Sequence, residues 1–243
     1  MPDQGRLTED RVSHSTPIPS PLYPPPPWKL PGARMLRVLF ETDKDPLLTW
    51  LPPKLTRSTP PYAIISIESY PESPVGPFSL ATQYLGCRAG FFIRAFALQA
   101  VVDSVPALAA LREVWGVPCK LGEVELSSKK NRVKGTVSRG RKLAKVRLEQ
   151  PEPIEPDLCR IDPVLCLRLA PSLQENVRHD LIQLVQLDPE YDIKSSSRGH
   201  GSVVYPTSGE DDGWDILPSR NVISAVHCEL DTELPLARFV MPY

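Results

Sequence analysis

The chain has 243 residues, 41% of them hydrophobic, and a formal net charge of −1, so it is long enough for one substantial hydrophobic core. The near-neutral charge gives no support to bulk binding of nucleic acids or acidic membranes. No apolar run approaches the ~20 residues that span a bilayer and the polar start does not resemble a secretory signal, so we expect a cytoplasmic protein without membrane contact.

The cysteines are scattered along the chain without a Cys-x-x-Cys pair, at positions 87, 119, 159, 166 and 228. Their odd number and their spacing favour buried, reduced thiols over a disulfide framework or a zinc site. No glycine-rich phosphate loop occurs in the sequence either. We therefore expect neither a metal nor a cofactor.

The N-terminal region divides into two parts by composition. Residues 1–16 are polar and are predicted to be disordered. Residues 17–31 contain eight prolines and predict an extended, polyproline-like arm. A surface arm anchored by Tyr23 and Trp28 is favoured over a ligand for a proline-binding module, because Trp28 leads directly into the first expected strand. Residues 32–243 are expected to form a single domain.

Strand patterns outnumber helical patterns in that domain. Period-two alternation and β-branched runs predict strands at 35–41, 63–70, 78–87, 91–101, 133–138, 143–148, 164–169, 181–187, 202–205, 222–230 and 237–241. Helices are expected at 43–50 and 104–115, the second capped by Ser104 and ended by Gly116, and a loop is expected at 195–201. The predicted fold class is α+β, with a curved, barrel-like antiparallel β-sheet and a few flanking helices.

A basic stripe from 129 to 147 carries nine Lys or Arg residues and no acid, which could bind phosphates. The alternation within it, however, predicts a hairpin with its charges on the solvent face. No aromatic residue interrupts the stripe to stack on a base. Nucleic-acid binding is therefore disfavoured.

The segment 112–122, Arg-Glu-Val-Trp-Gly-Val-Pro-Cys-Lys-Leu-Gly, joins the end of a helix to a rigid turn and a strand. Pro118 fixes its own φ, and Gly116 accepts backbone angles that are closed to other residues. Such a segment can hold Cys119 and Lys120 in one orientation at a pocket wall. A simple helix stop with an exposed Cys-Lys pair is the alternative.

This segment resembles the active-site segment of the acetoacetate decarboxylase family. Residues 28–30, 38–43 and 51–55 are similar to the opening strand, the first helix and its exit in that family, and the resemblance spans roughly 20–205. It implies the same α+β fold, a homo-oligomer and a small-molecule substrate.

In the family two adjacent lysines follow the proline, and the first of them forms a Schiff base with the substrate. This chain has Cys119 at that first position and retains the second lysine as Lys120. Because a thiol cannot form an iminium with a ketone, the resemblance implies the family fold without its usual electron sink.

The expected catalytic residues are Lys120, Glu113 and Cys119. We expect Lys120 to polarise a carbonyl from an apolar hollow, with Glu113 orienting it or forming only a structural ion pair. Cys119 as a nucleophile ranks lower, since no histidine lies near it in the sequence. The expected substrate-binding residues are Arg34, near the position of a family arginine, and Gln83, Tyr84, Phe92 and Trp115.

Three functions remain open on the sequence, of which nucleic-acid binding through the basic stripe is the least favoured. The first is a diverged lyase- or isomerase-like enzyme for a keto acid or polyketide-like substrate, acting by decarboxylation, isomerisation, dehydration or cyclisation without a lysine imine. The second is a domain that has lost catalysis and binds a ligand or partner. The intact frame from Pro118 to Gly122 favours the first, and the replaced lysine, together with the lack of an acid in 78–84, favours the second.

Overall fold

The computed structural model describes residues 4–159, 161–206 and 213–243. Its strands are β1 (Trp28–Glu41), β2 (Thr56–Arg57), β3 (Tyr62–Tyr70), β4 (Phe78–Ala89), β5 (Phe92–Val102), β6 (Cys119–Leu121), β7 (Glu123–Lys129), β8 (Arg132–Arg139), β9 (Arg141–Pro153), β10 (Val164–Pro171), β11 (His179–Leu187), β12 (Glu190–Val204), β13 (Val222–Leu234) and β14 (Arg238–Pro242). Its helices are α1 (Lys44–Trp50), α2 (Val105–Glu113) and the 3₁₀ turns η1 (Glu9–Arg11), η2 (Pro156–Leu158) and η3 (Trp214–Ile216).

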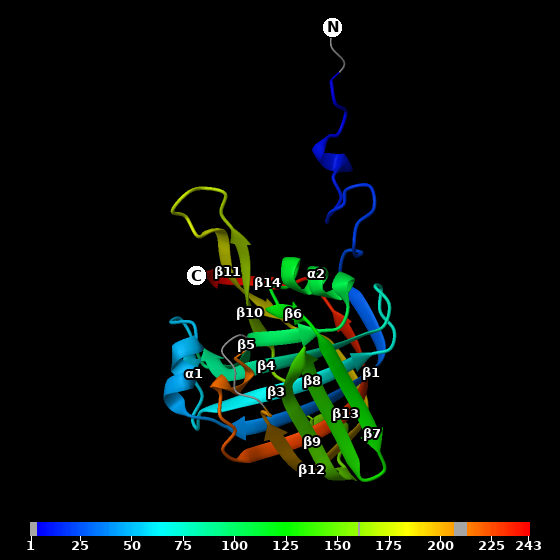
Figure 1. Ribbon diagram of the computed structural model, residues 1–243, viewed down its shortest axis with the longest axis vertical. Helices are drawn as coiled ribbons and strands as arrows, with labels where there is room; N and C mark the ends of the chain where they lie inside the picture. The colour runs from blue at the N-terminus through cyan, green and yellow to red at the C-terminus, as the bar shows by residue number, and fades with distance from the viewer. Residues whose placement is uncertain (1–3, 160, 207–212) are drawn as a thin grey trace.

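The strands form one long curved sheet in the hydrogen-bonded order β14-β11-β10-β5-β4-β3-β1-β13-β12-β9-β8-β7, and α2 packs beside β5 and β6 (Figure 1). The short strands β2 and β6 pair with β4 and β5 off this path. Neighbours run antiparallel except that β10 and β6 both lie parallel to β5. The sheet curls without closing. The predicted α+β class with a curved, barrel-like antiparallel sheet is confirmed.

The prediction of a loop at 195–201 is wrong, because these residues belong to β12. This strand pairs with β13 on one side and β9 on the other, with a register shift around Gly199. A Cβ at Gly199 would lie 2.3 Å from the carbonyl oxygen of Glu149. The serine- and glycine-rich composition, which is typical of a loop, here allows the backbones of β12 and β9 to approach closely.

Each face of the sheet packs its own hydrophobic core. On β3, Ile65 and Ile67 join the core enclosed by the curl of the sheet, whereas Ile64 and Tyr70 join the core beneath α2. This division follows from the alternation of side chains along a strand. The core beneath α2 also contains Trp115, and it surrounds the cavity described below.

Helix α2 and the turn after it form as the sequence predicts. The Ser104 hydroxyl accepts a hydrogen bond from the Ala107 N–H, and Gly116 follows the helix with a φ of +68°. The N–H of Val117 then donates to the Leu111 carbonyl. The chain leaves this turn as β6, which is hydrogen-bonded to β5.

Residues 4–27 extend away from the sheet, and in this described part of the N-terminal segment the only regular element is the turn η1 (Figure 1). Its end is fixed by aromatic side chains. Tyr23 and Trp28 are both buried, and the Tyr23 hydroxyl donates a 2.6 Å hydrogen bond to Glu113. Tyr23 and Trp28 therefore hold the end of this segment against the core beneath α2.

We expect Gly116→Ala to destabilise the fold far more than Gly140→Ala, although both glycines have a φ of +68°. A Cβ at Gly116 would lie 2.8 Å from the backbone of Arg168, whereas a Cβ at Gly140 meets nothing within 4 Å. The shared backbone strain costs about 1 kcal/mol, and the clash at Gly116 adds about 1–3 kcal/mol. Urea unfolding of both variants measures the difference; equal losses would contradict the steric explanation.

Candidate active site

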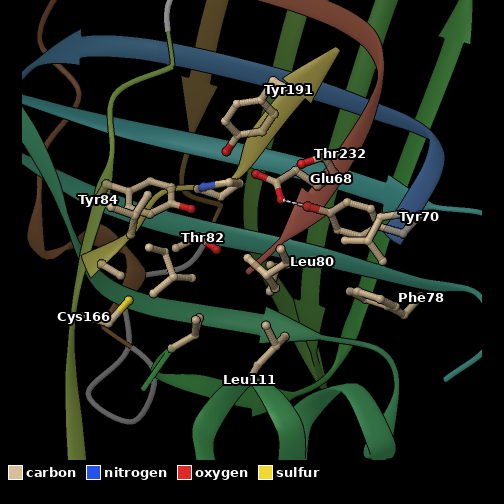
Figure 2. A pocket seen from close by; sticks show the side chains of 17 residues that line it. Glu68, Tyr70, Phe78, Leu80, Thr82, Tyr84, Leu111, Cys166, Tyr191 and Thr232 are labelled. Atoms are coloured by element: carbon tan, nitrogen blue, oxygen red, sulfur yellow. Dashed lines mark hydrogen bonds between the residues drawn. The ribbon is translucent and has the colours of Figure 1, made fainter. Parts of the chain in front are cut away.

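A cavity of about 60 Å³ lies between α2 and the sheet. It is lined by side chains from β1, β3, β4, β5, β10, β11, β12, β13 and α2, and by Val117 in the turn after α2. Most of these side chains are apolar, such as Leu80 and Leu111 (Figure 2). An enclosed apolar space with a few polar groups is typical of a small-molecule site.

Glu68 brings a carboxylate into this cavity from β3. Its side chain is buried and accepts hydrogen bonds from the Ser66 hydroxyl, at 2.6 Å, and from the Tyr70 hydroxyl (Figure 2). Both donors come from the same strand at a spacing of two residues, which places all three side chains on one face. The carboxylate is therefore held in a fixed orientation by its own strand.

Three tyrosines surround Glu68. Burial, and next the Glu68 charge, raise the pKa of Tyr70, Tyr84 and Tyr191 well above the usual value. All three phenols therefore stay protonated at neutral pH and remain hydrogen-bond donors. Tyr84 from β4 and Tyr191 from β12 direct their hydroxyl groups toward the space beside Glu68 (Figure 2).

Arg37 supplies a positive charge behind these tyrosines. It is buried on β1, and its guanidinium carbon lies 5.9 Å from the centre of the Tyr84 ring. Its charge opposes the rise in pKa of Tyr84 and Tyr191. Arg37 also lines a second cavity, of about 240 Å³.

The structure places Cys119 inside and Lys120 outside, because successive side chains of β6 point to opposite faces. Cys119 is buried in the core beneath α2, and burial raises the pKa of its thiol to about 12 although Arg112 opposes the rise. Lys120 is exposed and does not line the cavity. The expectation that apolar neighbours enclose Lys120 is wrong.

Cys119 approaches the cavity without lining it. It contributes to the raised pKa of Cys166, which does line the cavity, and the Arg112 side chain donates to the Cys119 carbonyl oxygen at 2.9 Å. The exposed Glu113 carboxylate accepts the hydrogen bond from Tyr23, and the Glu113 carbonyl accepts one from Arg168 at 2.8 Å. Glu113 therefore anchors the N-terminal segment.

Of the residues expected to bind substrate, Tyr84 lines the cavity and four others do not. Gln83 points to the opposite face of β4 and donates to the Tyr205 hydroxyl and the Trp214 carbonyl, both at 3.1 Å. Phe92 is exposed at the start of β5.

Trp115 and Arg34 also lie outside the cavity. Trp115 is fully buried, packs on Trp28 and donates to the Pro235 carbonyl at 2.6 Å, so it is a core residue. Arg34 is half-buried, and Arg37, three residues later, is the arginine beside the tyrosines.

Sequence reasoning missed Glu68, Tyr70, Tyr191 and Arg37. A signal for Glu68 exists, since the pattern Ser66-x-Glu68-x-Tyr70 places polar side chains on one face of an otherwise apolar strand. Tyr191 lies more than a hundred residues away, and no local pattern connects it to the site.

Among the described residues, no group of three or more His, Cys, Asp or Glu side chains is arranged to hold a metal ion. In the same part of the chain, no helix has the length and apolar character needed to cross a membrane.

The fold and the cavity define a class: a curved-sheet protein with a cavity around a buried carboxylate. The family model described as acetoacetate decarboxylase matches residues 15–243. The chain belongs to this family, whose members are enzymes.

Individual relatives agree with this assignment. The chain is 26% identical over 133 residues to an acetoacetate decarboxylase of Ralstonia nicotianae, and it spans about half the length of the curated relatives that it matches. A solved acetoacetate decarboxylase superposes with a TM-score of 0.90 at 20% identity, covering 98% of this chain and 99% of the other. The enduracididine biosynthesis enzyme MppR, solved with pyruvate, gives a TM-score of 0.81 at 18% identity, covering 96% and 99%. These two superpositions show the fold.

Proposed function

We propose that the protein is a lyase- or isomerase-like enzyme for a small keto substrate. It removes a proton from the carbon next to the carbonyl and does so without forming a lysine imine. Such enolisation underlies isomerisation, dehydration and cyclisation. The observation that carries the proposal is Glu68, a buried carboxylate oriented by two hydroxyl groups in an apolar cavity. A carboxylate in this setting is a candidate general base.

In the proposed mechanism, Glu68 accepts the proton that leaves the carbon next to the carbonyl. The carbonyl oxygen gains negative charge in this step and accepts hydrogen bonds from the neutral phenols of Tyr84 and Tyr191. Arg37 behind Tyr84 stabilises this charge electrostatically. Tyr70 holds Glu68 in place, and return of the proton to another atom completes the reaction.

The residue at the family's Schiff-base position supports proton transfer over decarboxylation. We assign that position to Cys119, whose thiol cannot form an iminium. Among the described residues, no lysine lines the cavity to replace it. A β-keto acid therefore finds no covalent electron sink in the cavity.

The structural neighbours suggest the first substrates to test. MppR has been solved with pyruvate and with the condensation product of pyruvate and imidazole 4-carboxaldehyde. Small 2-keto acids and small ketones are of a size suited to the cavity, and Arg37 offsets the charge of a carboxylate.

Proton NMR in D₂O tests the function directly. We expect the protein to accelerate exchange of the α-protons of pyruvate, acetoacetate or acetone, in proportion to its concentration. Exchange at the buffer rate for all three, at millimolar substrate, would count against enolisation.

Borohydride treatment separates this chemistry from the imine route. We expect reduction in the presence of acetoacetate to leave Lys120 unmodified, because Lys120 lies outside the cavity and Cys119 has no amine. Peptide mapping by mass spectrometry measures the adduct. A reduced adduct on Lys120 would contradict the proposal of imine-free chemistry.

A non-catalytic ligand-binding role is the second candidate, and the thiol of Cys119 at the position that we assign to the Schiff-base lysine favours it. Saturable binding of a keto acid without exchange or turnover would support it. We also propose a cytoplasmic homo-oligomer. The exposed apolar side chains of Phe91, Phe92 and Leu173 support an assembly that covers them.

A further inference from the structure

A thiol and two arginines line the second cavity. One of the arginines is Arg37, which also lies beside the Tyr84 ring. Cys159, which follows η2, lines this space of about 240 Å³ together with Arg37 and Arg198. The carboxylate of Asp162 also lines it. Arg198 lies at an exposed position on β12, so the cavity is reached from solvent by a small molecule.

A second thiol lies next to Cys159. Cys159 shares the cavity with Ser224 and Val226 of β13, and alternation along that strand places Cys228 on the same face. Both cysteines belong to the core beneath α2, and each thiol shifts the pKa of the other, lowering that of Cys159 and raising that of Cys228.

The chain before Cys159 is held against the same region of the sheet. The Ile154 N–H donates to the Ser196 carbonyl at 3.0 Å, and the Ser196 hydroxyl donates to the Ile154 carbonyl at 2.9 Å. Ser196 is the partner of Cys228 in the pairing of β12 with β13. The chain that leads to Cys159 and the strand that carries Cys228 therefore both lie against the same part of β12.

Cys159 differs chemically from the other buried cysteines. Burial raises the pKa of Cys87, Cys119 and Cys166. The pKa of Cys159 is lowered, first by the hydrogen bond with Cys228 and then by the charges of Arg37 and Arg198, although burial opposes the change. Thiolates react with peroxides much faster than thiols do.

We propose that Cys159 is a peroxide-reactive modification site and that Cys228 resolves it to a disulfide within the chain. The Cys159 thiolate attacks one oxygen of hydrogen peroxide, the O–O bond breaks, and hydroxide leaves and takes up a proton as Cys159 becomes a sulfenic acid. The Cys228 thiol then loses its proton as its sulfur attacks the Cys159 sulfur, and the hydroxyl group leaves as water. Two thiols are oxidised, and one peroxide is reduced to two waters.

This site is independent of the proposed enolisation, but the two sites share Arg37, which lines the second cavity and lies beside the Tyr84 ring. The charge of Cys159 contributes to the raised pKa of Tyr191, so forming the disulfide removes a negative charge beside a residue of the candidate active site. The disulfide also ties the connection between β9 and β10 to β13.

The test uses the full chain, freshly reduced and treated with hydrogen peroxide at equimolar and at tenfold concentration. We expect two of the five thiols to disappear, a mass loss of two hydrogens, and a Cys159–Cys228 linked peptide that dithiothreitol removes. We expect Cys159 to react at least about tenfold faster than Cys119, the deeply buried thiol. No linked peptide, or oxidation of all cysteines at similar rates, would overturn the proposal.

Variants separate the two roles. In Cys228→Ser the sulfenic acid at Cys159 should persist and be trapped by dimedone, whereas Cys166→Ser, the matched buried control, should still form the Cys159–Cys228 link. Dimedone labelling absent from Cys159 in a folded Cys228→Ser protein would overturn the assignment of Cys159 as the attacking thiol. If a variant does not fold, the peptide map of the unaltered chain decides the proposal alone.

Discussion

Substituting Glu68 by glutamine is expected to slow α-proton exchange by about 10²- to 10⁴-fold, the effect typical of losing a positioned general base. Glutamine has nearly the same shape, but Ser66 and Tyr70 donate to separate oxygens of Glu68, so the amide oxygen accepts from one of them and the other hydroxyl turns to accept from the amide NH₂. It cannot take up the substrate proton. The rate of exchange by proton NMR, with substrate binding measured in parallel, shows whether the chemical step is lost.

The matched control is Glu125→Gln, which removes the same charge from an exposed position on β7. This control should exchange protons at the unaltered rate. Both variants should keep the circular dichroism spectrum and the unfolding midpoint of a folded protein. A fully active Glu68→Gln protein would remove Glu68 as the base and, with it, the proposed mechanism.

Substituting Trp115 by alanine should lower the free energy of unfolding by about 3–5 kcal/mol, the usual cost of deleting a buried tryptophan side chain. Trp115 has no exposed surface and makes an edge-on contact with Trp28, with ring centres 5.0 Å apart. The change also leaves the Pro235 carbonyl without the indole N–H that now reaches it at 2.6 Å. Denaturant unfolding monitored by circular dichroism measures the loss.

Trp50→Ala provides the comparison, because the Trp50 side chain at the end of α1 is 51% exposed. We expect this change to cost only about 0.5 kcal/mol. Similar losses of unfolding free energy for the two variants would show that the packing around Trp115 does not hold the turn after α2 in place. The result would also weaken the assignment of Trp115 to the core instead of the substrate site.

Much of the fold was predictable from local patterns. The Ser104 cap, the Gly116 stop and most of the period-two strands follow from short stretches of sequence and appear where they were expected, although β1 and β12 begin well before the expected strands and β7 was not predicted. Failures occur where composition and pairing disagree. The segment 195–201 is rich in serine and glycine, yet it forms a strand, because β9 and β13 supply hydrogen-bonding partners on both sides.

The candidate site was less predictable. A period-two pattern shows that two faces exist, but it does not say which face encloses a cavity. Cys119 and Lys120 are neighbours on β6 whose side chains point to opposite faces, so Cys119 is buried and Lys120 is exposed. The same ambiguity applies to Gln83 and Tyr84, where only Tyr84 faces the cavity.

By itself, the sequence determined the sheet-rich class, the cap and stop of α2, and the segment after it that resembles one enzyme family. Only the tertiary structure decided that Glu68, Tyr84 and Tyr191 meet around one cavity with Arg37 behind them. These residues come from β3, β4, β12 and β1, and their meeting depends on how the sheet curls and on the register of pairs far apart in the chain. Local periodicity carries no information on that register, because it is set by contacts that form only when the whole sheet packs.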